Sequence, residues 1–510
     1  MKKDKVERIC ITYPPFENNE GFPLMSLNEQ FQWLRNPSYT YPILPAYAAT
    51  LLKNNGYNVF FLDTIARNMD TIEWFSELDK IEPQLIFFET RTPIINYIWD
   101  AIDTLKNKYG KVYVVLAGDH VTSLPEESLI NSKADFIITG GNYEILLLSI
   151  VKHINNGDKL EKGIYYRNKS GDIKNTGKFI LDYPLDSLPF IDRNLTNWKI
   201  YSKKNEYFKK YPGTFIMSGR GSIYNRLNSN SSSVLFNSVM LRSPVNVVDE
   251  IEYLNKRYGI KEIIDCTICF PTDEWLSLFC ETMRERGLNK KVYIDCYMYL
   301  NILHFEDFKM MKKAGFKTII FNLPTINNYT IEKIGIDRNN IEQMVESIKL
   351  AKKAGLFIDL MVKLGYPNET EEDIIKTFQI VKKLMLGGYV NSMNVSIFVP
   401  YPDTQLFNYC KENDLLKTKN WFDFDMRKSV IKLNFDEEKL YKYVEYFYNL
   451  SFNPLYLFHK IADIRDIYDI RHHINSFKNI LFYYFRKNHL KNSCHYKDLR
   501  LKPAVSENLK

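Results

Sequence analysis

With 510 residues, 45% of them hydrophobic and 25% charged, the chain has the size and composition of a soluble globular protein of two or three domains. Seven irregularly spaced cysteines exclude a disulfide framework and indicate the reducing cytoplasm, and no apolar run predicts a secretory signal or a transmembrane segment. The net charge is +7, and residues 471–510 account for all of it, since they hold nine Lys/Arg against two Asp/Glu. The rest of the chain is therefore close to neutral, which argues against a nucleic-acid-binding groove in the main domains.

The first part of the chain, residues 1–155, alternates strand-like and helix-like segments. Five short runs of β-branched and aromatic residues are separated by longer amphipathic stretches. Five strands with helices between them predict a doubly wound, Rossmann-like parallel sheet. The expected strands are RICITY (8–13), YNVFFL (57–62), QLIFFE (84–89), KVYVVLAG (111–118) and DFIITG (135–140).

Ligands of such sheets bind at the carboxyl ends of the strands. The residues at these ends are therefore candidate ligand contacts, although the glycines among them would also be needed for ordinary turns between strands and helices. The candidates are Tyr13, Pro15, Glu89, Thr90, Gly118, His120, Gly140 and Gly141.

Residues 156–210 are predicted to form a linker with a hairpin, whose turn lies at NKSGD. A second alternation of strands and helices follows over residues 211–430. Its six units predict a partial (βα)6 barrel of the TIM type, although counting alone leaves a closed eight-fold barrel open. Its expected strands are TFIMS (214–218), EIIDCT (262–267), KVYIDCY (291–297), KTIIFNL (317–323), LFIDLMVKL (356–364) and MNVSIFVP (393–400).

The last part, residues 431–510, is predicted to be helical and is rich in aromatic and basic residues. We expect a helix that packs its aromatic side chains on the barrel and leaves its lysines in solvent. Contact with a membrane surface or another anionic partner is the alternative for this amphipathic, basic segment.

Several motifs occur in an order that resembles the cobalamin-binding radical S-adenosylmethionine enzymes. They are GDHVTSLPEE, LPFIDRNL, the glycine-flanked loop GRGS, LRSPVNVVDEIEYL, MKKAGF, LAKKAG, GYPNET and VPYPDTQLFNYCKEN, and the match runs from about residue 5 to about residue 430. The resemblance implies cobalamin in the crevice of the N-terminal sheet with no protein ligand to cobalt. It adds Tyr143 to the candidate contacts.

In that family, the loop after the first barrel strand carries three cysteines that hold a four-iron–four-sulfur cluster, which binds S-adenosylmethionine. The corresponding positions here are Ser222, Leu227 and Asn230 or, with a shorter spacing, Ser222, Arg226 and Ser229, and no cysteine occurs between Cys10 and Cys266. A 4Fe–4S cluster is therefore not expected, and S-adenosylmethionine binding is left in doubt. A vestigial pocket for it would include Gly219, Arg220, Gly365 and Tyr401.

A second departure lies after the fourth barrel strand. The family tends to carry a glutamate there, where this chain reads NLPT at 322–325. Three thiols remain near neighbouring strand ends, at Cys266, Cys269 and Cys296. They are interpreted as buried packing residues, with a relocated cluster or metal site and a redox pair as the alternatives.

Three functions remain open from the sequence. The first is a cobalamin-dependent protein that works without the radical site, for example in methyl transfer. The second is a non-catalytic cobalamin-binding scaffold or partner of an active relative. The third is an active radical enzyme with its cluster on Cys266, Cys269 and Cys296. The expected partners are a small-molecule cofactor and, for the second function, another protein.

Overall fold

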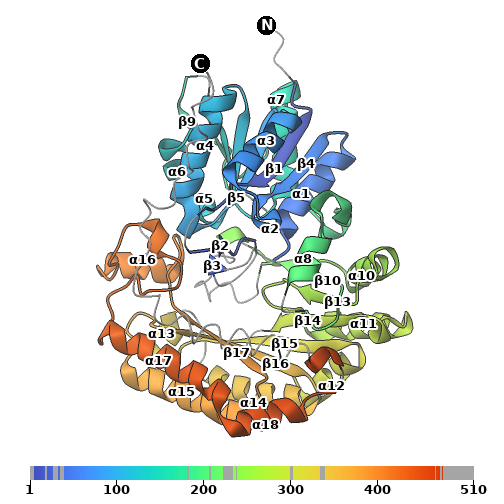
Figure 1. Ribbon diagram of the computed structural model, residues 1–510, viewed down its shortest axis with the longest axis vertical. Helices are drawn as coiled ribbons and strands as arrows, with labels where there is room; N and C mark the ends of the chain where they lie inside the picture. The colour runs from blue at the N-terminus through green and yellow to red at the C-terminus, as the bar shows by residue number, and fades with distance from the viewer. Residues whose placement is uncertain are drawn as a thin grey trace.

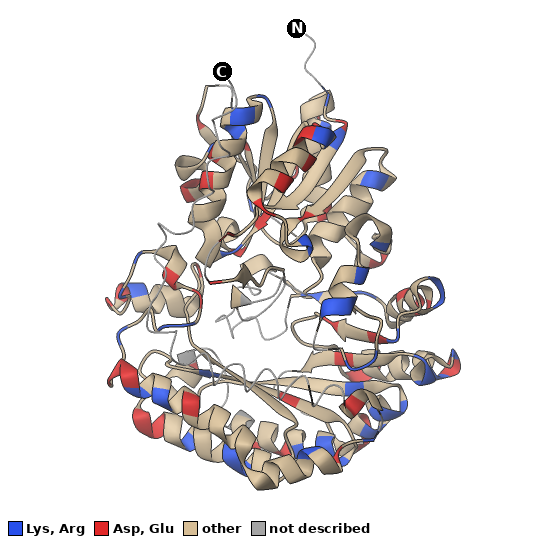
Figure 2. Cartoon of the chain, viewed as in Figure 1, with Lys and Arg blue, Asp and Glu red and all other residues tan. Residues whose placement is uncertain are grey.

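The computed structural model describes residues 5–17, 20–26, 31, 33–34, 40–168, 170–178, 180, 183–205, 208–221, 234–236, 238–298, 303–333, 339–465, 467–470 and 474. Its two large β-sheets lie one above the other in Figure 1, the N-terminal sheet at the top and the barrel sheet at the bottom. Both are α/β layers, as the sequence predicts. Lys, Arg, Asp and Glu are interspersed over the outer helices, whereas the strands are mostly uncharged (Figure 2).

The N-terminal sheet has the strand order β4-β1-β5-β6-β7-β8-β9, and its first five strands are parallel. Alternate residues of β5 face opposite layers: Phe87 packs in one core cluster and Phe88 in another. Burial on both faces is the signature of a doubly wound sheet. The parallel strands are β1 (Arg8–Tyr13), β4 (Asn58–Asp63), β5 (Leu85–Thr90), β6 (Tyr113–Gly118) and β7 (Phe136–Ile138). The helices are α1 (Ile43–Asn54), α2 (Thr64–Arg67), α3 (Thr71–Ile81), α4 (Ile95–Tyr109), α5 (Asp119–Ser123), α6 (Pro125–Asn131) and α7 (Tyr143–Asn156).

The hairpin predicted in the linker forms, with strands β8 (Ile164–Arg167) and β9 (Ile173–Asn175). It pairs antiparallel with β7 and so extends the N-terminal sheet. Helix α8 (Lys199–Lys204) then precedes the barrel.

The second sheet contains six parallel strands in sequential order, with β10 and β17 at its two edges. This is the partial (βα)6 barrel that the sequence predicts. Its strands are β10 (Gly213–Ile216), β13 (Glu262–Asp265), β14 (Tyr293–Met298), β15 (Phe316–Leu323), β16 (Phe357–Leu364) and β17 (Ser392–Ile397). Its helices are α10 (Pro244–Tyr258), α11 (Asp273–Glu285), α12 (Phe305–Lys313), α13 (Asn328–Lys333), α14 (Asn339–Lys353), α15 (Glu371–Leu386) and α16 (Gln405–Glu412).

Helix α10 shows how local sequence sets these elements. The Ser243 hydroxyl accepts a hydrogen bond from the Asn246 amide, and Pro244 occupies the first turn. Val247 and Ile251, with their neighbours on the same stripe, are buried, and the helix ends at Gly259, whose φ is +67°. A side chain would strain that left-handed conformation, so the glycine ends the helix cleanly.

The C-terminal helices α17 (Glu437–Asn449) and α18 (Pro454–Ala462) pack on the outside of α15. The chain after α18 is held at the base of the barrel, where Asp469 pairs with Lys317 over 3.0 Å. No helix within the described ranges is long and apolar enough to cross a membrane.

Candidate functional site

A buried carboxyl group lies at the carboxyl edge of the N-terminal sheet. The Tyr13 hydroxyl, at the end of β1, donates a hydrogen bond to Glu89 Oε2, at the end of β5, over 2.6 Å. Burial raises the pKa of Glu89 to about 7, against the opposing effects of this hydrogen bond and of nearby Arg91. The pKa of Tyr143 is also raised, first by its burial and then by the Glu89 carboxylate. Two other predicted residues, Tyr13 and Tyr143, thus lie beside the Glu89 carboxyl group, which can hold a proton near neutral pH.

A buried ion pair adjoins this carboxyl group. Arg91 Nε lies 3.2 Å from Asp119 Oδ2, and Asp119 Oδ1 accepts hydrogen bonds from the Thr92 and His120 amides over 3.1 and 2.6 Å. Tyr401, which follows β17 of the barrel, is buried close by; burial raises its pKa, Arg91 lowers it and Asp119 raises it further. The predicted Tyr401 therefore lies where the two sheets meet, beside two charged residues that sequence reasoning missed.

Two of the predicted glycines are explained by contacts within the chain. A Cβ atom on Gly118, whose φ is +132°, would lie 2.0 Å from the Thr90 carbonyl oxygen. One on Gly141 would lie 2.2 Å from the ring of Phe236. The Thr90 backbone and the Phe236 side chain therefore account for these two glycines whether or not a ligand binds. Gly140 also has a positive φ, +83°, as a turn residue.

Several buried polar groups at this edge have no hydrogen-bond partner within the described residues. They are Thr90 Oγ1, Thr92 Oγ1 and Asn142 Nδ2. Buried polar atoms in folded proteins are nearly always paired, and exceptions are common where a ligand completes them. The edge therefore fits a polar ligand such as the amide-rich rim of a corrin. The Pro15 carbonyl is already used, because it accepts from the Tyr97 hydroxyl.

His120 lies in a different environment from the Tyr13–Glu89 pair. Its ring is fully buried between those of Trp99 and Trp421, whose centroids are 6.0 and 5.1 Å away. Its Nε2 is 3.7 Å from Glu127 Oε2, which is beyond hydrogen-bonding distance. The structure therefore places His120, a predicted ligand contact, in the packing between α5 and the segment that contains Trp421, about 300 residues further along the chain. No sequence pattern pointed to this contact.

A second buried ion pair joins the N-terminal sheet to the loop that follows the first barrel strand. Arg220 Nη1 lies 2.6 Å from Glu144 Oε1, in the first turn of α7, and also contacts the Asn142 side-chain carbonyl. The Tyr183 hydroxyl donates to the same Glu144 oxygen. Arg220 and Glu144 are 2% and 0% exposed, so this is an interior pair. Gly219 and Arg220, which were predicted to belong to a vestigial S-adenosylmethionine pocket, are thus held against the carboxyl edge of the N-terminal sheet, next to Gly141.

The residues predicted to replace the cluster cysteines, at 222, 226, 227, 229 and 230, lie outside the described residues. The chain just before them is held firmly. Ser218 and Gly219 donate their amides to Thr267 Oγ1 over 2.9 and 3.0 Å, and the Ser218 hydroxyl donates to Asp265. Burial raises the pKa of Asp265.

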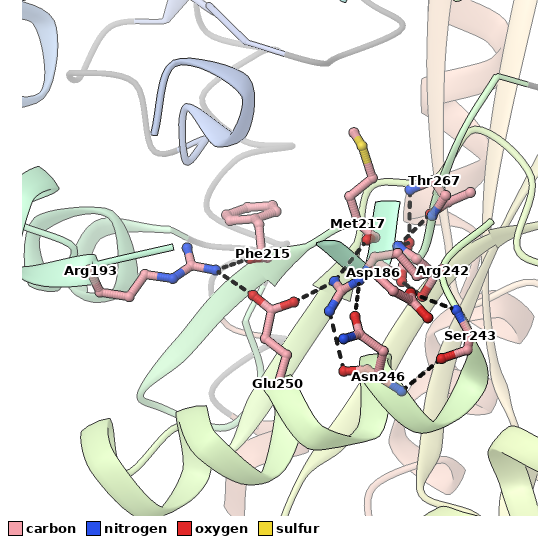
Figure 3. A network of polar contacts seen from close by, with 12 residues as sticks. Asp186, Arg193, Phe215, Met217, Arg242, Ser243, Asn246, Glu250 and Thr267 are labelled. Carbon is pink, nitrogen blue, oxygen red and sulfur yellow. Dashed lines mark hydrogen bonds and ion pairs between the residues drawn. The ribbon is translucent and has the colours of Figure 1, made fainter. Parts of the chain in front are cut away.

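Figure 3 shows a further network around the same strand, built on the carboxylate of Glu250 in α10. Its two oxygens face Arg242, at 2.5 Å, and Arg193, at 3.8 Å. The two guanidinium groups donate to the carbonyls of Met217 and Phe215. Two arginines on one carboxylate leave a local surplus of positive charge, and sequence reasoning missed all three residues. A signal was present for Glu250, which lies on the same helical stripe as the buried Val247 and Leu254.

Cys266, Cys269 and Cys296 do not form a metal-binding group among the described residues. Asp265 and Cys296 are register partners on β13 and β14, so their side chains share a face of the sheet, and Cys266 follows on the other face. Burial raises the pKa of both Cys266 and Cys296. Across the part of the chain that the structure describes, no three His, Cys, Asp or Glu side chains are placed to hold a metal ion. The described residues thus present no ligand set for a cluster.

The predicted Gly365 belongs to a turn held by another buried carboxylate. Glu369 accepts the amides of Gly365 and Tyr366 over 2.6 and 3.2 Å and the hydroxyl of Thr325 over 2.6 Å. Burial raises the pKa of Glu369 to about 7. Gly365 has a φ of +86° and abuts Leu440. The geometry makes this turn a structural support for the loop after β16.

Comparisons with known proteins agree with the resemblance. A profile of the radical SAM superfamily matches residues 230–381. The chain is 26% identical over 437 residues to an uncharacterised methyltransferase of Pyrococcus horikoshii, covering 85% of this chain and 90% of that one. The solved structure of the radical S-adenosylmethionine methyltransferase TsrM from Kitasatospora setae, with cobalamin and a [4Fe–4S] cluster bound, has a TM-score of 0.60 at 15% identity, covering 80% of this chain and 75% of that one. The cobalamin-dependent S-adenosylmethionine radical enzyme OxsB, with aqua-cobalamin and S-adenosylmethionine bound, has a TM-score of 0.67 at 12% identity, covering 96% and 71%.

These matches overturn the expectation that a 4Fe–4S cluster is not bound, and with it the doubt about S-adenosylmethionine. The matching profile is that of the radical SAM superfamily; among the similar solved structures, TsrM holds cobalamin and a [4Fe–4S] cluster, and OxsB holds aqua-cobalamin and S-adenosylmethionine. The expectation was wrong because it inferred a missing cofactor from one loop. The absence of cysteine from this loop removes one set of ligands for the cluster. It does not exclude a cluster that is held by cysteines elsewhere in the chain. Residues 230–381 therefore match the radical SAM superfamily, and the chain has the fold of the cobalamin-dependent radical SAM enzymes TsrM and OxsB.

Proposed function

We propose that this chain binds cobalamin along the carboxyl edge of its N-terminal sheet and takes part in methyl transfer to a small-molecule acceptor. The observation that carries the proposal is the set of unpartnered polar groups of Thr90, Thr92 and Asn142 beside the Tyr13–Glu89 pair, counted within the described residues. Doubly wound sheets bind ligands at this edge. The similarity to a methyltransferase over most of both chains supports the type of reaction.

Bound cobalamin would supply a cobalt that can carry a methyl group. The protein's own residues hold and orient it: Thr90, Gly140 and Tyr143 lie along the edge, and Glu89 keeps a proton near neutral pH with Tyr13 fixing its carboxyl group. The Arg220–Glu144 pair holds the start of the barrel loop against this edge. Because these groups are buried, water is excluded where the two units meet.

A second function is favoured by one observation. Residues 222–233 contain no cysteine, which is the feature expected of a non-catalytic cobalamin-binding partner of an active relative.

The third candidate, an active radical enzyme with a cluster on Cys266, Cys269 and Cys296, would require these thiols to come together. All six described cysteines are free thiols, which supports a reducing cytoplasm as the location of either activity.

One experiment separates these candidates. The protein is purified anaerobically, reconstituted with iron, sulfide and hydroxocobalamin, and its iron and cobalt are measured per chain. The proposed function predicts stoichiometric cobalt, and loss of the methyl group from methylcobalamin when a suitable acceptor is supplied. Cobalt without methyl transfer, with or without an added active relative, would favour the non-catalytic function. Iron that disappears in a Cys266→Ser, Cys269→Ser double variant but persists in Cys280→Ser would favour the relocated cluster.

A further inference from the structure

A buried tyrosine of the barrel unit lies near the edge of the N-terminal sheet with its hydroxyl unused. Tyr401 comes shortly after β17 and is 1% exposed, and its hydroxyl has no hydrogen-bond partner within the described residues. Unpaired polar groups are rare in the interior of folded proteins, and water or a ligand completes many of those that occur. The Tyr401 hydroxyl is therefore a candidate ligand contact that comes from the barrel and not from the sheet.

The backbone of Tyr401 is fixed by the turn that leads into α16. The Tyr401 carbonyl accepts hydrogen bonds from the Thr404 amide and hydroxyl over 3.2 and 2.7 Å. Thr404 also caps α16, because its hydroxyl oxygen accepts the Phe407 amide over 3.2 Å. Figure 1 shows α16 at the side of the molecule where the two units meet. The turn thus holds the tyrosine in place at this junction.

The same turn is hydrogen-bonded to the N-terminal unit. Ser123 Oγ, at the end of α5, donates to the Pro402 carbonyl over 2.9 Å. Helix α5 begins at Asp119, whose carboxylate lies 3.2 Å from Arg91 Nε. Burial raises the pKa of Tyr401, which the charge of Arg91 lowers and that of Asp119 raises further. The tyrosine therefore lies beside the charged pair at the edge of the N-terminal sheet.

Three other buried hydroxyls at this edge also lack a partner within the described residues: those of Thr90, Thr92 and Tyr143. Thr90 is the last residue of β5, and the Thr92 amide donates to Asp119 Oδ1 over 3.1 Å. The pKa of Tyr143 is raised by burial first and then by the charges of Glu89 and Asp119. All three hydroxyls therefore belong to residues around the charged groups that lie beside the barrel tyrosine.

The charges at this edge balance one another. Arg91 pairs with Asp119, and Glu89 keeps its proton up to a pKa of about 7. Hydroxyl groups without a surplus of positive charge suit neutral acceptors, such as the carbonyl oxygens of amides, better than carboxylates. The chemistry of the edge therefore favours a neutral ligand that carries amide groups.

We propose that the Tyr401 hydroxyl donates a hydrogen bond to an amide carbonyl of the ligand bound at the edge of the N-terminal sheet. This inference rests on the proposed function, in which the ligand is cobalamin. The other three hydroxyls come from the N-terminal unit, so Tyr401 makes the affinity for the ligand depend on the barrel as well. The site is complete only where the two units meet.

The test compares Tyr401→Phe, which keeps the ring and removes only the hydroxyl, with the wild type. We expect the dissociation constant for hydroxocobalamin, measured by absorption titration of the anaerobically prepared full chain, to rise about tenfold. The free energy of unfolding without ligand should stay unchanged, because the hydroxyl has no partner to lose within the described residues. The stabilisation that added cobalamin gives should shrink with the affinity.

Two further variants make the test specific. Tyr258→Phe removes another hydroxyl that has no partner within the described residues, at the end of α10, where the ring packs on Trp198. It should leave the affinity for cobalamin unchanged. Ser123→Ala removes the hydrogen bond to the Pro402 carbonyl and should weaken binding in the wild type. In the Tyr401→Phe background it should weaken binding less, because both changes act on one contact.

The possible failures are distinguishable. If the wild type binds cobalamin and Tyr401→Phe binds it equally well, this inference is wrong and the proposed function stands. The same follows if Tyr258→Phe loses as much affinity, or if Tyr401→Phe is also destabilised without ligand, since the hydroxyl would then have a structural role. A wild-type protein that binds no cobalamin would overturn the proposed function, and this inference with it.

Discussion

The structure contains two buried polar clusters that differ in how completely their threonine hydroxyls are hydrogen-bonded. Around the first barrel strand, Thr267 Oγ1 accepts two amides and Glu250 faces two arginines. At the edge of the N-terminal sheet, Thr90 and Thr92 are equally buried, but their hydroxyls have no partner within the described residues. The comparison teaches that the threonine hydroxyl of the barrel cluster is used within the protein, although Arg193 Nε and Nη1 in that cluster lack partners among the described residues, whereas both threonine hydroxyls of the sheet edge are left over for a ligand.

The largest expected effect breaks the barrel cluster. Glu250→Ala leaves Arg193 and Arg242 buried without their carboxylate, and removing one partner of a buried ion pair costs about 3–5 kcal/mol. We expect a loss of this size in the free energy of unfolding measured with urea. Glu252→Ala, two residues along the same helix, is the control, because its partners Lys256 and Arg286 are at the surface and their loss costs little.

The second effect uses the titratable group of the sheet-edge cluster. Glu89 holds its proton up to a pKa of about 7 in the folded protein, whereas the unfolded chain releases it near 4.5. Between these values the folded state binds more protons, so this carboxyl group lowers the free energy of unfolding as pH rises, by up to about 3 kcal/mol above pH 7. Glu89→Gln should remove that decrease, as measured by urea unfolding at several pH values. An unchanged pH dependence in the variant would show that Glu89 ionises normally.

The third effect compares the same substitution in both clusters. Thr267→Val removes the acceptor of the Ser218 and Gly219 amides, and leaving them unpaired should cost about 2 kcal/mol or more. Thr90→Val removes a hydroxyl that has no partner among the described residues, so we expect the unfolding free energy of the ligand-free protein to be unchanged or slightly higher. Equal losses in the two variants would mean that the two clusters do not differ.

The elements of the fold were predictable because local pattern determines them. The β-branched run QLIFFE marks β5 to within one residue, and Ser243, Pro244 and Gly259 mark both ends of α10. The hairpin was predicted, but its pairing with β7 was not, because its alternating residues are compatible with either a free hairpin or a sheet edge.

The site was predictable in its position and less so in its contacts. Tyr13 and Glu89 followed from the rule that ligands bind at strand ends, whereas Tyr143 and Tyr401 came from the family resemblance. The Arg220–Glu144 pair joins residues 76 positions apart in the sequence, and the His120–Trp421 contact joins residues still further apart. Such partners are set by how the two sheets meet, and no local pattern encodes that arrangement.

Cobalamin binding tests the contrast between the two clusters most directly. Anaerobically prepared protein is mixed with hydroxocobalamin, separated by gel filtration, and analysed for cobalt and for the absorption spectrum of the bound corrin. We predict one cobalamin per chain, with affinity lowered by Thr90→Val and unchanged by Thr267→Val. A wild-type protein that retains no cobalt, or a loss of affinity confined to Thr267→Val, would contradict cobalamin binding at the edge of the N-terminal sheet.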